Sequence, residues 1–88
     1  MKLGVAIVGL GDRWDGQYLP AIRSLADRFE VRAICEQVSL RATRAASELH
    51  AEAVDGFRVM ANREDVDAVL CLGDQWFGTA PILAACDA

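Results

Sequence analysis

An apolar run that ends at two closely spaced glycines constrains the fold of this chain most strongly. Residues 5–8 are all apolar, and Gly9 and Gly11 follow on either side of Leu10. A buried strand of a parallel sheet has such a continuous apolar run. The first glycine permits a tight turn, and the second lets the backbone approach a ligand whose negative charge suits the next helix's amino end. We therefore expect Gly9, Leu10 and Gly11 to form a phosphate-binding turn.

Strand-like and helix-like apolar patterns alternate along the rest of the chain. Strands are expected at residues 3–9, 30–35, 53–54 and 66–72, and a loop is expected at 12–17. Helical spacing recurs at 19–29, 40–50, 57–62 and 80–86, with Ser39, Asp55 and Thr79 as expected N-caps. Inward positions of the middle two helices are Ala42, Ala45, Ala46, Leu49, Phe57, Met60 and Ala61. The order βαβαβαβα predicts an α/β fold, a doubly wound parallel sheet with helices on both faces.

Composition restricts the size of the protein and the class of its partners. The 88 residues, 53% hydrophobic and 25% charged, suit one small, folded, soluble domain. The net charge is −4 and no basic stripe is present, which argues against a nucleic-acid partner. No apolar run is long enough to span a bilayer, and no separate signal-peptide region precedes the first strand. We therefore expect a cytoplasmic protein that contacts neither nucleic acid nor membrane.

The cysteines and the single histidine offer no metal site or disulfide framework. Cys35, Cys71 and Cys86 are odd in number and widely spaced, and no C-x-x-C pair occurs. Cys71 and Cys86 lie in apolar patterns, where cysteine usually acts as a small hydrophobe. His50 is expected at a helix end, where a cation suits the dipole. Asp65 and Asp67 are expected to face solvent, and no nucleophile with a neighbouring base can be assembled, so we assign no catalytic residue.

Glu36 follows the second expected strand and lies about 20 residues or somewhat more beyond the glycine turn. A carboxylate at that distance accepts hydrogen bonds from the ribose hydroxyls of a dinucleotide and repels a 2′-phosphate. The alternative is an ordinary solvated acid. Arg41 and Arg44 are close in sequence and within reach of a 2′-phosphate. The expected cofactor is therefore NAD, with NADP not excluded.

Further candidate cofactor contacts follow the expected strand ends, because ligands of open α/β sheets bind at the carboxyl edge. Arg13 follows the turn and is placed to pair with a pyrophosphate; its alternative is a surface arginine. Trp14 and Trp76 either flank the cofactor or cover the core or a neighbouring subunit. After the fourth strand, the candidate contacts are Leu72, Gly73 and Asp74.

Three segments together resemble a known family over nearly the whole chain. They are residues 5–11 (VAIVGLG), 31–36 (VRAICE) and 65–69 (DVDAV). The combination is similar to the N-terminal half-domain of the Gfo/Idh/MocA oxidoreductases. The resemblance implies a Rossmann domain of strand order 3-2-1-4 that binds NAD or NADP. It also implies a larger α/β domain beyond it, and hydride transfer with a sugar, cyclitol or related hydroxylated substrate.

Two departures from the family pattern limit what the resemblance implies. The family's loop after strand four usually reads T-P-N-x-x-H, whereas residues 73–78 read GDQWFG without a histidine. The chain also ends at Ala88, before the family's E-K-P motif with its catalytic lysine. Residues 1–88 are thus expected to be a truncated dinucleotide-binding domain that lacks the substrate domain and is inactive alone.

Other functions and a structural consequence accompany this expectation. A non-catalytic nucleotide-sensing or structural Rossmann module is the alternative, favoured by the missing histidine. An S-adenosylmethionine methyltransferase ranks last, because Val8 stands where such enzymes commonly carry an acid. Truncation would leave strand four at the sheet edge, so we also expect self-association through that edge or through apolar surface.

Overall fold

A computed structural model describes residues 2–36, 38–54, 56–72 and 80–88 of the chain. Four parallel strands form one sheet in the order β3-β2-β1-β4. The strands are β1 (Leu3–Val8), β2 (Phe29–Cys35), β3 (Glu52–Ala53) and β4 (Ala68–Cys71). The α/β fold and the strand order 3-2-1-4 expected from the sequence are therefore confirmed.

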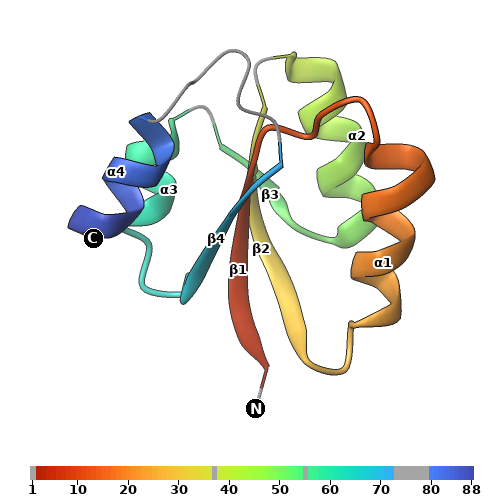
Figure 1. Ribbon diagram of the computed structural model, residues 1–88, viewed down its shortest axis with the longest axis horizontal. Coiled ribbons are helices and arrows are strands. Elements are labelled where there is room, and N and C mark those ends of the chain that lie inside the picture. The colour runs from red at the N-terminus through yellow and green to blue at the C-terminus, as the bar shows by residue number, and fades with distance from the viewer. Residues whose placement is uncertain (1, 37, 55, 73–79) are drawn as a thin grey trace.

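Helices cover both faces of the sheet, as Figure 1 shows: α1 and α2 lie on one side, and α3 and α4 on the other. The helices are η1 (Trp14–Tyr18, a π-helix), α1 (Leu19–Ser24), α2 (Ser39–Leu49), α3 (Phe57–Ala61) and α4 (Ala80–Asp87). Among the described residues, no helix is long and apolar enough to cross a membrane.

The core has two layers because β1, in the middle of the sheet, is buried on both faces. Ile7 and Ile34 belong to the layer beneath η1, α1 and α2, which also contains Ala45 and Ala46 of α2. Met60 of α3 and the small residues Ala6 and Ala33 form the other layer. Each large apolar side chain buried in this way contributes about 1.5–3 kcal/mol. The apolar patterns of the sequence thus identify the residues that hold the sheet between its helices.

The first helical region differs from the expected loop and long helix. Residues 14–18 form η1 rather than loop, with Arg13 O accepting bonds from the amides of Gln17 and Tyr18 at 2.9 and 3.1 Å. The helix α1 then ends at Ser24, not at Phe29. Phe29 instead begins β2 opposite Leu3. Strand pairing therefore overrides the helical spacing of the apolar residues here.

The fourth strand is shorter than expected, because Asp67 forms a different contact. Its amide donates to Gly4 O at 2.7 Å, and its carboxylate oxygen Oδ2 accepts from Gly4 N at 2.8 Å. The parallel ladder therefore starts at Ala68. A Cβ on Gly4 would lie 1.8 Å from Asp65 O, so this approach of two chain segments requires glycine.

Two smaller expectations about the middle elements change, and the expected position of His50 at a helix end is confirmed. Ser39 is the first residue of α2 rather than its cap, and Val38 is the N-cap without a side-chain cap bond. The third strand covers Glu52–Ala53, one residue earlier than expected. His50 caps the end of α2 in the left-handed region, with φ 56°. Asp55 and Thr79, the two other expected caps, lie outside the described residues.

Cys71 and Cys86 were expected to act as small hydrophobes, but both are exposed. Cys71 ends β4, which lies at the sheet edge and is covered far less than β1. Partial desolvation raises the pKa of the Cys71 thiol, so its thiolate is disfavoured. Cys35, in the buried part of β2, is the cysteine that behaves as a core residue.

Candidate cofactor site at the strand tips

The turn after β1 has the backbone geometry that its glycines permit. Gly9 and Gly11 have φ values of 71° and 73°, in the left-handed region. The amide of Gly9 donates to Cys35 O at 2.8 Å, which ties the turn to the end of β2. A Cβ on Gly11 would lie 3.0 Å from Leu72 O, so a side chain there would crowd the residue after β4. Both glycines therefore allow the turn's backbone conformation, and the lack of a side chain at Gly11 also lets the turn pack closely against Leu72.

Glu36 lies beside this turn, as its spacing in the sequence predicts. Its Oε1 accepts a hydrogen bond from the amide of Leu10 at 3.3 Å. Its Oε2 accepts one from the amide of Val38 at 2.7 Å. A carboxylate oxygen has two lone pairs, so each oxygen can still accept a further donor such as a sugar hydroxyl. The two amides thus hold the carboxylate in place without exhausting its acceptor capacity.

Arg41 also reaches the turn, from the first part of α2. Its Nη2 donates to Gly11 O at 2.6 Å. Arg44 is different: its exposed guanidinium pairs with Glu48, with Nε 3.3 Å from Oε1. The structure therefore brings Arg41, and not Arg44, into contact with the turn.

Trp14 and Arg13 contribute to the fold in ways that the sequence left open. The Trp14 residue is only 3% exposed and belongs to the core layer under η1 and α1. Its indole therefore covers the core, which was one of the two alternatives, and a contact of Trp14 with the cofactor stays a prediction. Arg13 is exposed, and its carbonyl begins η1. Pairing of the Arg13 guanidinium with a pyrophosphate stays a prediction.

Leu72 completes the described part of the strand-tip cluster. Its amide donates to Val8 O at 3.1 Å, and its carbonyl faces Gly11. The candidates Gly73, Asp74 and Trp76 lie outside the described residues. Val38 was not among the predicted residues, although its amide holds Glu36. No side-chain pattern could have indicated Val38, because only its backbone takes part.

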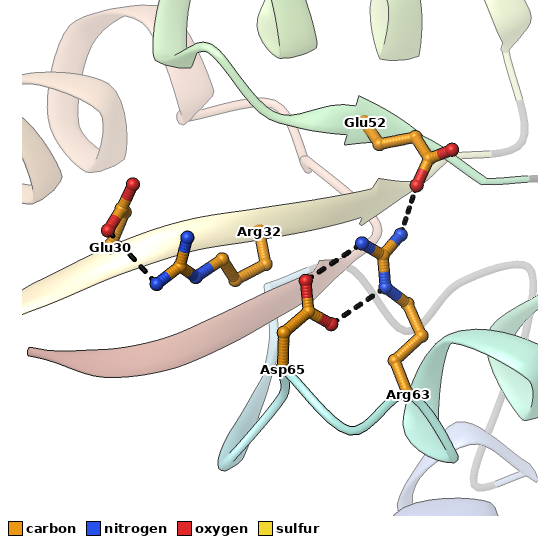
Figure 2. A network of polar contacts seen from close by, with 5 residues as sticks. All are labelled: Glu30, Arg32, Glu52, Arg63 and Asp65. Atoms are coloured by element: carbon orange, nitrogen blue, oxygen red, sulfur yellow. Dashed lines mark hydrogen bonds and ion pairs between the residues drawn. The ribbon is translucent and has the colours of Figure 1, made fainter.

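A second polar cluster lies away from the turn, at the amino ends of β3 and β4. Figure 2 shows Arg63 between Asp65 and Glu52; two of its nitrogens lie 2.9 Å from the Asp65 carboxylate oxygens. These hydrogen bonds lower the pKa of Asp65 and raise that of Arg63. Arg32 pairs with Glu30 at 3.2 Å on β2. Asp65 and Asp67 are exposed, as expected, but both are engaged within the chain.

Within the part of the chain that the structure describes, no group of three or more His, Cys, Asp or Glu residues is placed to hold a metal ion. The strand-tip cluster instead offers a left-handed glycine turn, a carboxylate and a guanidinium. Such a constellation at the carboxyl edge of a parallel sheet of order 3-2-1-4 defines a Rossmann-type dinucleotide-binding domain.

Comparison with known proteins assigns the family. The sequence model of the Gfo/Idh/MocA family, described as an oxidoreductase family with an NAD-binding Rossmann fold, matches residues 3–88. The chain therefore belongs to the Gfo/Idh/MocA family. No curated protein matches it significantly.

Solved structures of oxidoreductases contain the same fold. An oxidoreductase from Thermotoga maritima is 24% identical, with a TM-score of 0.84 over 97% of this chain and 26% of its own. A scyllo-inositol dehydrogenase from Lactobacillus casei, solved with NAD(H) and scyllo-inositol, is 23% identical, with a TM-score of 0.80 over 99% and 26%. KijD10, a 3-ketoreductase from Actinomadura kijaniata solved with NADP and TDP-benzene, is 32% identical, with a TM-score of 0.68 over 78% and 21%.

The chain spans only about a quarter of the length of these oxidoreductases. The matched quarter corresponds to an NAD-binding Rossmann fold, in agreement with the family assignment. The resemblance inferred from the three sequence segments is confirmed.

Proposed function

We propose that this chain is the dinucleotide-binding portion of an NAD(P)-dependent oxidoreductase. In the complete protein, hydride would pass between the nicotinamide and a sugar, cyclitol or similar hydroxylated substrate. The observation that carries the proposal is the contact between Glu36 and Leu10 at 3.3 Å. It sets a carboxylate beside the left-handed turn, where one ligand can contact both through its ribose and its phosphates.

NAD is the proposed cofactor, with NADP as the alternative. The Glu36 carboxylate, held by two backbone amides, would accept hydrogen bonds from ribose hydroxyls and repel a 2′-phosphate. These two hydrogen bonds already hold the Glu36 side chain in place, so less side-chain freedom is lost when a ligand binds, which favours affinity. Related structures differ in the cofactor they contain, since KijD10 was solved with NADP and the inositol dehydrogenase with NAD(H).

The test is a titration of the chain with NADH, read by energy transfer from tryptophan to the reduced nicotinamide and by the melting temperature. Wild-type protein is expected to bind, and Glu36→Ala to bind at least about tenfold more weakly, the loss expected for hydrogen bonds to a charged group. Glu64→Ala is the matched control, because Glu64 is also an exposed glutamate but lies beyond α3. Absence of both signals at millimolar NADH would contradict the proposal.

We also propose that residues 1–88 are part of a larger domain, and that a separate substrate domain supplies the catalytic groups. The coverage of about a quarter of the related oxidoreductases supports this division. The alternative is a non-catalytic nucleotide-sensing module, favoured by the absence of a histidine from residues 73–78. Hydride transfer by the protein from the full reading frame would distinguish the two functions.

Self-association of the isolated chain is a further proposal. The edge strand β4 carries Leu70 at 36% exposure, and α4 carries exposed Ile82 and Leu83. An uncovered edge strand with apolar side chains tends to pair with another chain. Light scattering should therefore detect species above the monomer as concentration rises, and a strict monomer at high concentration would contradict the expectation.

A further inference from the structure

The side chain of Arg41 joins α2 to the glycine turn after β1. Its Nη2 lies 2.6 Å from Gly11 O, a short distance for a nitrogen–oxygen hydrogen bond. The bond is partly buried and connects residues 30 positions apart. Arg44, three residues further along α2, is paired with Glu48 instead. Of the two arginines considered for a 2′-phosphate, Arg41 is therefore the one that contacts the turn.

The contact adds a restraint to a turn whose two glycines allow it many backbone conformations. Gly9 and Gly11 both have positive φ, and glycine loses more conformational freedom on folding than any other residue. Glu36 binds the amide of Leu10, and Arg41 binds the carbonyl of Gly11. The carboxylate and the guanidinium thus hold the peptide groups on either side of the Leu10–Gly11 peptide, the carboxylate through an N–H and the guanidinium through a C=O.

Fixing the Gly11 carbonyl also fixes the amide that follows it. The peptide group between Gly11 and Asp12 is planar, so its N–H points opposite to its C=O. Because Arg41 holds Gly11 O, the Asp12 amide is held pointing away from the guanidinium. Amides at this point, ahead of the first helical segment, are those that a Rossmann turn presents to a pyrophosphate.

We propose that Arg41 is a positioning residue for the dinucleotide turn and does not recognise a 2′-phosphate. This inference rests on the proposed function. Its consequence is that Arg41 supports NADH and NADPH binding equally, since both cofactors have the same pyrophosphate. A residue that recognised the 2′-phosphate would affect NADPH alone.

The test compares dissociation constants of NADH and NADPH for Arg41→Met, Arg41→Lys and the control Arg44→Met. Arg41→Met is expected to weaken both cofactors by about tenfold, as for one charge-assisted hydrogen bond, while their ratio stays within about twofold. Arg41→Lys, which keeps a cationic donor, should recover part of the loss. Arg44→Met should bind both cofactors like the wild type. A loss confined to NADPH, or no loss, would overturn the proposal.

Hydrogen exchange in the ligand-free chain tests the contact without a cofactor. In Arg41→Met the Leu10 amide, which is buried in the same turn and donates to Glu36, should exchange at least about tenfold faster, while amides within β1 stay unchanged; unchanged exchange at Leu10 would overturn the proposal. If the wild type bound neither cofactor although exchange changed as expected, the proposed function would fail. The positioning role would then fail with it, and the contact would be structural only.

Discussion

The backbone amide of Gly4 donates to Asp67 Oδ2 at 2.8 Å, and the Asp67 amide donates to Gly4 O at 2.7 Å. This reciprocal pair joins the start of β1 to the segment before β4. It gives a physical role to Asp67, the second aspartate of the DVDAV segment. Its carboxylate accepts the Gly4 amide bond that a backbone carbonyl would accept in a regular parallel sheet. The central strand and the edge strand are thus aligned from their amino ends.

We predict that Asp67→Ala destabilises the fold by about 1–3 kcal/mol, because it leaves the partly buried Gly4 amide without its acceptor. The free energy of unfolding from urea denaturation measures the effect. Glu64→Ala, at an exposed position three residues earlier, should change stability by less than about 0.5 kcal/mol. Equal effects of the two substitutions would contradict the assigned contact.

Gly4→Ala should be more damaging, because its Cβ would meet backbone rather than a flexible side chain. The distance from this Cβ to Asp65 O would be 1.8 Å without movement, so β1 and the segment before β4 must separate. A loss of about 3 kcal/mol or more is expected from such overpacking. Gly16→Ala is the control: nothing lies within 4 Å of its Cβ position, and stability should be unchanged or slightly higher. Thermal unfolding of both variants would show the contrast.

Local sequence patterns predicted the four strands and the position of Glu36 beside the glycine turn, and the family resemblance predicted the strand order. Four apolar runs define four strands, and the carboxyl ends of adjacent parallel strands must meet at one edge. The sequence did not predict the end of α1 at Ser24 or the contact of Arg41 with Gly11. These depend on strand pairing and on contacts between distant residues, which local spacing does not record.

Acid is expected to remove the contribution of Asp65 to stability. Hydrogen bonds from Arg63 lower the pKa of Asp65 in the folded chain below its usual value. A carboxylate with a depressed folded pKa stabilises the fold above its unfolded pKa, about 3.9, and loses that contribution as pH falls through the folded pKa. The stability difference between wild type and Asp65→Asn should therefore be constant near neutrality and shrink below about pH 4.

The stability difference between wild type and Asp65→Asn should also shrink in high salt, because the Arg63–Asp65 ion pair is exposed and screened by ions. Urea titrations of both proteins at several pH values and two salt concentrations measure it. Asp87→Asn is a suitable control, since Asp87 is an exposed aspartate at the end of α4. A pH-independent difference between wild type and Asp65→Asn would contradict the contribution of Arg63.

Substitutions of Trp14 test fold stability and cofactor binding separately. Because its indole lies in the core at 3% exposure, Trp14→Ala should cost about 3–5 kcal/mol. Trp14→Phe keeps an apolar ring and should fold, with NADH affinity within about twofold of the wild type, because the ring is buried in the core. Binding is best read here by thermal shift, because the substitution removes a fluorophore. A selective loss of NADH binding in a stably folded Trp14→Phe protein would instead place the indole against the cofactor.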